Sequence, residues 1–112
     1  MTSTQHILIV EDEDIIRASL RKLLERHEFS VSEAVSVKAA QESFNLSDFD
    51  LIISDLRLPG AAGTELIQPA GPVPVLMMTS YASLRSAVDT MRQGAADYIS
   101  KPFDHEEMLQ AV

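Results

Sequence analysis

Four short apolar runs in this chain are each followed by a polar residue that could take part in phosphate or metal chemistry. These residues are Glu11-Asp12, Asp55, Thr79 and Lys101. If the runs are parallel strands of an α/β sheet, their carboxyl ends share one edge, where ligands bind. Three carboxylates, one hydroxyl and one ammonium group would then converge. The pattern predicts a hard-cation site beside an aspartate that acts as a nucleophile or phosphoryl acceptor.

The charges of these residues indicate which cation would be needed. Glu11, Asp12 and Asp55 bring three negative charges, and Lys101 returns one positive charge. A phosphoryl group is itself negative on its equatorial oxygens, and two unit charges ~4 Å apart interact by ~4 kcal/mol at an effective dielectric of about 20. A divalent cation would offset this repulsion. Oxygen-only ligands with a phosphoryl partner favour Mg²⁺ over Zn²⁺, so we expect Mg²⁺ as the cofactor.

Composition limits the class of protein. The chain has 112 residues, 46% of them hydrophobic, no cysteine and a formal net charge of −8. This length suits one domain with a real core. No apolar run approaches the ~18 residues of a membrane span. The N-terminus lacks the features of a signal peptide, and the acidic charge opposes direct nucleic-acid contact. We therefore expect a cytoplasmic protein that binds neither nucleic acid nor membrane.

Strand and helix patterns alternate along the chain. Strands are expected at about 6–10, 31–35, 50–54, 73–78 and 97–100, and helices at about 14–27, after a cap at Ser36, near Thr64, after a cap at Ser83 and after a capping box at Asp104. In the first helix we expect one buried face, made of Ile15, Ile16, Leu20, Leu23 and Leu24. The third helix should be short, because Pro69, Gly71, Pro72 and Pro74 follow closely.

This alternation predicts a flavodoxin-like, doubly wound α/β fold. Five parallel strands with right-handed crossovers place helices on both faces of the sheet. In the strand order 2-1-3-4-5, the switch point lies between the first and third strands. Glu11, Asp12 and Asp55 would meet there. The last helix pattern reaches Val112 after only two turns, so we expect this helix to be truncated and an output domain to follow residue 112.

Four motifs, in order and with consistent spacing, resemble the receiver domain of bacterial two-component response regulators over nearly the whole chain. They are Ile7-Leu8-Ile9-Val10-Glu11-Asp12, Asp55-Leu56-Arg57-Leu58-Pro59-Gly60, Met78-Thr79-Ser80-Tyr81-Ala82 and Asp97-Tyr98-Ile99-Ser100-Lys101-Pro102-Phe103. The stretch from Met78 to Phe103 is most similar to the receivers of enhancer-binding transcription activators that use the alternative sigma factor.

The resemblance assigns a role to each site residue. It implies that Asp55 accepts a phosphoryl group from a sensor histidine kinase. Asp12 would bind Mg²⁺ directly, Glu11 would hold it through water, and Asp55 and the backbone carbonyl of Arg57 would supply further ligands. Lys101 would contact the phosphoryl group.

The resemblance also implies a switch rather than a turnover enzyme. Thr79 would move toward the phosphoryl group, and Tyr98 would change rotamer in response. The face formed by residues 85–94, residues 97–100 and the last helix would then contact the chain's own output domain or form a homodimer, and so regulate transcription.

Three other functions compete with this interpretation. A haloacid-dehalogenase-like phosphatase also uses a strand-end aspartate and Mg²⁺, but it has a second aspartate where this chain has Arg57. A flavodoxin-type flavin module cradles phosphate in its first loop, where Glu11-Asp12-Glu13-Asp14 would repel it. A receiver could also signal by protein contact without phosphorylation.

Overall fold

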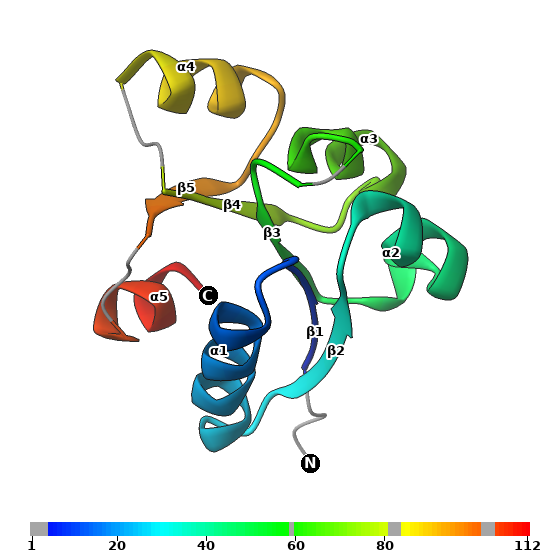
Figure 1. Cartoon of the computed structure of the whole chain (residues 1–112), viewed down its shortest axis with the longest axis vertical. Helices are drawn as coiled ribbons and strands as arrows, with labels where there is room; N and C mark the ends of the chain where they lie inside the picture. Colours follow the sequence, from blue (N-terminus) through cyan, green and yellow to red (C-terminus); the bar gives the residue numbers. More distant parts are fainter. Residues whose placement is uncertain (1–4, 59, 81–83, 102–104) are drawn as a thin grey trace.

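The sheet has the predicted topology. The structure, a computed structural model, describes residues 5–58, 60–80, 84–101 and 105–112. Five strands form one all-parallel sheet in the order β2-β1-β3-β4-β5, as Figure 1 shows. The strands are β1 (His6–Val10), β2 (Ser30–Ala34), β3 (Leu51–Asp55), β4 (Val75–Thr79) and β5 (Asp97–Ser100). The predicted flavodoxin-like, doubly wound fold is confirmed.

Helices cover both faces of this sheet (Figure 1). On one face lie α1 (Asp14–Arg26) and α5 (His105–Ala111). On the other lie α2 (Val37–Ser43), α3 (Ile67–Ala70) and α4 (Leu84–Arg92), with two 3₁₀ turns, η1 (Leu46–Asp48) and η2 (Gly63–Leu66). None of the helices in the described part of the chain is both long and apolar enough to cross a membrane.

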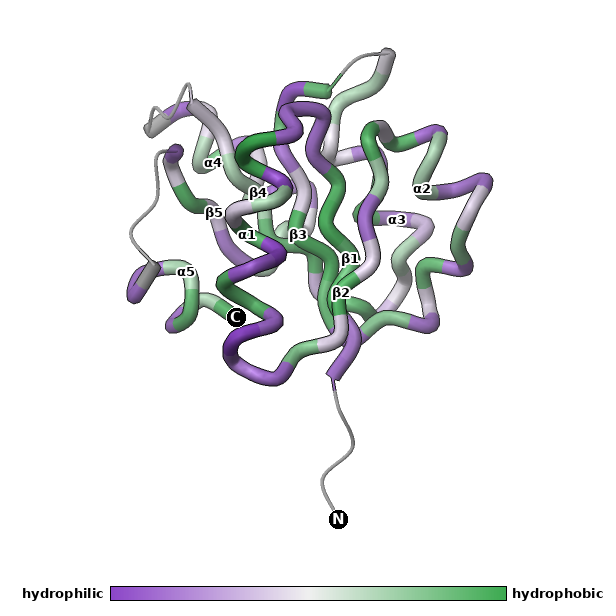
Figure 2. The backbone as a smooth tube through the Cα atoms, turned by 60° about the horizontal axis from the view of Figure 1, so that its bottom comes forward, coloured by the Kyte–Doolittle hydropathy of each residue, from purple (hydrophilic) through white to green (hydrophobic). Residues whose placement is uncertain are grey.

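Two hydrophobic layers hold the sheet between the helices. Alternate residues of β1 point to opposite faces: Leu8 and Val10 belong to the layer under α2 and α3, whereas Ile7 and Ile9 belong to the layer under α1 and α5. Burying one such side chain fully contributes about 1.5–3 kcal/mol. Figure 2 shows hydrophobic stretches in the central strands β1 and β3, with hydrophilic stretches along α1. The strands therefore form a fixed frame for the residues at their ends.

The first turn of α1 departs from the prediction. Leu20, Leu23 and Leu24 are buried as expected, but Ile15 is 86% exposed, so placing it on the buried face was wrong. The side chain of Arg17, by contrast, is only 16% exposed. Arg17 lies inward because its guanidinium group donates a hydrogen bond to the backbone carbonyl oxygen of Glu11.

The third helix is short, as predicted, although Pro69 is not its stop signal. Pro69 lies inside α3, close to its start. The first residues of any helix have no intrahelical partner for their N–H groups, so proline is tolerated there. The helix ends at Gly71, whose φ of 61° is in the left-handed region that glycine adopts easily. The expected caps at Ser83 and Asp104, and the motif residues Tyr81, Ala82, Pro102 and Phe103, lie outside the described residues.

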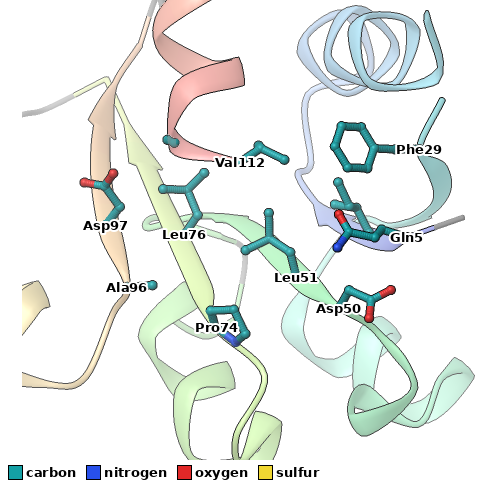
Figure 3. Close-up of a pocket in the computed structure, with 11 residues that line it drawn as sticks. Gln5, Phe29, Asp50, Leu51, Pro74, Leu76, Ala96, Asp97 and Val112 are labelled. Atoms are coloured by element: carbon teal, nitrogen blue, oxygen red, sulfur yellow. The ribbon is translucent and has the colours of Figure 1, made fainter. Parts of the chain in front are cut away.

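A cavity of about 210 Å³ lies at the amino ends of the strands. Phe29, Leu51, Leu76 and Val112 line its apolar part (Figure 3). Ala111 of α5 also lines it. The polar residues described next lie at the carboxyl ends of the same strands, so this cavity is at the opposite edge of the sheet from them.

Candidate phosphoacceptor and metal site

Three carboxylates meet where β1 and β3 end. Val10 of β1 pairs with Ser54 of β3, so the residues that follow each of them are neighbours. One ligand oxygen from each of Glu11, Asp12 and Asp55 lies within 4.8 Å of the others. The predicted convergence of these acids is therefore present in the structure.

The ammonium group of Lys101 joins the cluster from β5. Its Nζ lies 2.8 Å from Glu11 Oε1 and 3.0 Å from Asp55 Oδ2. The Lys101 backbone N–H donates to the carbonyl oxygen of Thr79 at 2.7 Å, which fixes the start of the loop after β5. The Lys101 side chain is 5% exposed, so these ion pairs are shielded from water.

Burial and the ion pairs together shift the pKa values of Glu11 and Lys101. Burial raises the pKa of Glu11 to about 7; the hydrogen bond from Lys101 works against this rise, and the charge of Asp55 adds to it. Burial alone would lower the pKa of Lys101, but its hydrogen bonds to Glu11 and Asp55 outweigh that effect and raise the pKa. Lys101 therefore stays charged, and one positive charge does not fully compensate the buried acids.

The loop after β3 is folded tightly against Asp55. The backbone N–H of Arg57 donates to Asp55 Oδ1 at 3.3 Å, and Arg57 forms an isolated bridge with Ala62. At Gly63 the chain again lies against the end of β3, where the Gly63 N–H donates to the carbonyl oxygen of Leu56 at 2.9 Å. A Cβ atom on Gly63 would lie 2.1 Å from the backbone oxygen of Asp55. Only glycine fits this close approach.

The two predicted switch residues occupy different surroundings. Thr79 is buried at the end of β4, one position beyond Met78, which is the partner of Asp55 in the sheet. Tyr98 lies half-buried in β5, and its hydroxyl donates to Ser86 Oγ of α4 at 3.1 Å. The structure thus places Thr79 beside the end of β3, where Asp55 lies, and connects Tyr98 to α4.

Two residues near the site were not predicted. Neither Arg17 nor Ser86 belongs to the motifs from which the site residues are predicted. The only sequence signal for Arg17 was the i, i+3 pair with Asp14, whose Oδ1 accepts a hydrogen bond from Arg17 Nη2 at 2.5 Å. Ser86 had no distinguishing signal, since a serine on an amphipathic helix is common.

Comparison with known proteins decides the family. Residues 7–112 match the family model of the response regulator receiver domain. The chain belongs to this family. The prediction of a receiver domain is therefore confirmed, and the acidic cluster lies in a receiver fold.

Individual relatives agree with this receiver assignment. The response regulator protein PilR of Pseudomonas aeruginosa is 41% identical over 114 residues, which cover 98% of this chain but only 26% of PilR. A response regulator of Burkholderia pseudomallei, crystallised with a phosphorylated aspartic acid, a calcium ion and citrate, has a TM-score of 0.85 and 30% identity, covering 96% of this chain and 65% of that one.

A third relative is a receiver dimer. The beryllofluoride-activated NtrC4 receiver domain dimer has a TM-score of 0.85 and 28% identity, covering 94% of this chain and 90% of that one. The receiver described here thus matches isolated receivers almost end to end, and it spans about a quarter of the length of PilR.

Proposed function

We propose that this receiver accepts a phosphoryl group on Asp55 from a sensor histidine kinase in a Mg²⁺-dependent reaction. The observation that carries the proposal is the cluster of Asp55, Glu11, Asp12 and Lys101 at one sheet edge. The phosphorylated aspartic acid in the Burkholderia pseudomallei relative supports it.

The donor set fits a magnesium ion. Three carboxylates can place oxygen ligands within 4.8 Å of one another, and oxygen is the donor that Mg²⁺ prefers. Burial, together with the charge of Asp55, raises the pKa of Glu11 despite the hydrogen bond from Lys101, and a divalent cation would favour the ionised form of this carboxyl group. Glu11, Asp12 and Asp55 would hold the ion, with the backbone carbonyl of Arg57 as a further ligand. When bound, Mg²⁺ would neutralise charge on the transferred group.

The chemical step uses Asp55 as the nucleophile. A carboxylate oxygen of Asp55 forms a bond to phosphorus while the phosphorus–nitrogen bond of the kinase phosphohistidine breaks. The imidazole leaves with the electron pair and takes up a proton. Lys101, already 3.0 Å from Asp55 Oδ2, follows the new negative charge and stabilises the product. This acceptor role does not require turnover, so we assign a switch rather than an enzyme.

Phosphorylation would change the output face through Thr79, Lys101 and Tyr98. The modification adds roughly −1.5 to −2 charges at Asp55, which attracts the Thr79 hydroxyl and the Lys101 ammonium group. Movement of Thr79 would make room for the Tyr98 ring and shift a pre-existing equilibrium of α4 and β5.

The face formed by α4, β5 and α5 is the proposed contact for an output domain or a second receiver. The NtrC4 receiver dimer supports a homodimer. PilR, whose length is only 26% covered, supports a further domain in the same polypeptide. Regulation of transcription, in the manner of enhancer-binding activators, is the output that we propose.

Intact-mass spectrometry tests the acceptor. Incubation with acetyl phosphate and Mg²⁺ should add one phosphoryl group to the parent protein, none to Asp55→Ala, and one to the control Asp48→Ala, whose side chain is exposed. An equal adduct on Asp55→Ala, or no adduct on the parent, would contradict the proposed function.

A further inference from the structure

We propose that Arg17 is a positioning residue for the metal site: it orients the peptide between Glu11 and Asp12, so that its loss weakens Mg²⁺ binding. This inference rests on the proposed function. Arg17 is not one of the residues expected to hold the ion. It contacts the backbone of Glu11 and the carboxylates of Asp14 and Glu33.

The contacts of Arg17 fix the backbone directly under the acids. Its Nη1 donates to the carbonyl oxygen of Glu11 at 2.8 Å. That carbonyl belongs to the peptide unit that leads into Asp12. The N–H of Glu11 donates to the carbonyl oxygen of Ala34 at 3.0 Å. The two peptide units that flank Glu11 are therefore held by different elements, α1 on one side and β2 on the other.

Two carboxylates hold Arg17 itself in place. Asp14 Oδ1 accepts a hydrogen bond from Arg17 Nη2 at 2.5 Å, and Arg17 Nε forms an ion pair with Glu33 Oε1 of β2 at 3.5 Å. Arg21 Nη1 lies 2.7 Å from Glu33 Oε2. Glu33 therefore bridges two arginines of one helix. A planar guanidinium group with several fixed donors is suited to this task, because one group can satisfy the Glu11 carbonyl and Glu33 together.

Positioning and simple charge predict opposite effects on Mg²⁺ affinity. Removing a positive charge near three acids should strengthen cation binding if charge alone matters. Releasing the Glu11 carbonyl should weaken binding, because Asp12 is then no longer held in place. Arg21 provides a matched control, since it lies on the same helix and binds the same Glu33. Among the described residues, its side-chain hydrogen bonds go to Glu25 and Glu33 and not to the Glu11 carbonyl.

The experiment measures Mg²⁺ affinity without phosphorylation. Isothermal titration with MgCl₂ and the metal-free melting temperature are recorded for the parent, Arg17→Met, Arg17→Lys and Arg21→Met. We expect the Mg²⁺ dissociation constant to rise about tenfold in Arg17→Met, to rise less in Arg17→Lys, which retains one charged donor nitrogen, and to stay unchanged or fall in Arg21→Met. If Arg17→Met does not fold, Arg17→Lys serves as the test, because it keeps the positive charge but loses the planar fork of donors, and it should still raise the constant several-fold.

The outcomes separate this inference from the proposed function. An unchanged or tighter Mg²⁺ affinity in Arg17→Met, or equal weakening in Arg21→Met, overturns the positioning role even if the parent forms its phosphoryl adduct. A parent that binds Mg²⁺ but forms no adduct contradicts the proposed function and leaves the role of Arg17 intact.

Discussion

The hydroxyl of Tyr98 donates a hydrogen bond to Ser86 Oγ at 3.1 Å, and this bond connects β5 to α4. These two elements form the proposed output face. A side-chain bond between them can hold α4 in one arrangement, because the partly buried pair lies between a strand in the sheet and a helix on its surface.

This bond should contribute to stability as a coupled pair. We expect Ser86→Ala and Tyr98→Phe each to lower the free energy of unfolding, and the double variant to lose less than the sum, with a coupling of about 0.5–1.5 kcal/mol. Urea unfolding of the four proteins measures it. Strictly additive losses would show that the two hydroxyls do not act together.

Activation should reach this pair from the acidic site. Beryllofluoride with Mg²⁺ mimics an aspartyl phosphate, so we expect backbone NMR shifts in α4 and β5 as well as around Asp55. Ser86→Ala should shift the α4 signals of the unactivated protein part of the way toward their activated positions. Shifts confined to the neighbourhood of Asp55 would contradict a switch.

Glu11 should make stability depend on pH. Its folded-state pKa of about 7 lies above the ordinary value of 4.5. Between these values the folded state binds more protons than the unfolded state, so in Mg²⁺-free buffer this group lowers stability as pH rises from about 5 to about 7. The loss should be on the order of 1–3 kcal/mol.

The matched variants for this pH effect are Glu11→Gln and Glu42→Gln. Glutamine at position 11 should remove the decline, whereas the exposed Glu42 should not affect it. Saturating Mg²⁺ should reduce the decline in the parent, because the ion favours ionised Glu11. A parallel pH profile for the parent and Glu11→Gln would be inconsistent with a raised pKa.

Lys101 should matter most when metal is absent. Lys101→Met leaves the buried carboxylates without their ammonium partner, so we expect a loss of about 3 kcal/mol in Mg²⁺-free buffer. Added Mg²⁺ should stabilise this variant more than it stabilises the parent, because the ion then supplies the missing positive charge. Thermal unfolding with and without Mg²⁺ measures both effects, with the exposed Lys22→Met as control. An equal Mg²⁺ response in Lys101→Met and the parent would contradict this role.

Gly63 should tolerate no side chain. A Cβ atom there would lie 2.1 Å from the Asp55 backbone oxygen and 2.6 Å from Ser54 Oγ. Gly63→Ala should therefore destabilise the fold by about 1–3 kcal/mol and reduce adduct formation on Asp55. Gly71→Ala is the control, since its Cβ meets nothing within 4 Å and only its positive φ costs energy. Equal losses in the two variants would show that the contact with β3 is unimportant.

Much of this architecture could be predicted because apolar runs and their polar ends are visible in the sequence. The fifth strand occupies the predicted residues 97–100, and the third and fourth strands are displaced by one or two positions. Those displacements arise because a strand that is buried on both faces shows no alternation. Its ends are then set by backbone hydrogen bonds, such as that from Leu56 N–H to Met78 O.

The site was less completely predictable. Strand order alone brings Glu11, Asp12 and Asp55 together. The inward position of Arg17 depends on a backbone carbonyl, which no residue type in the sequence reveals. Ile15 then occupies an exposed position that its apolar character did not indicate.

The cavity at the amino ends of the strands and the reactive acids lie at opposite ends of the same sheet. The buried length of the strands separates them. Substitutions around the cavity can therefore alter one end of the domain while the acids at the other end keep their surroundings.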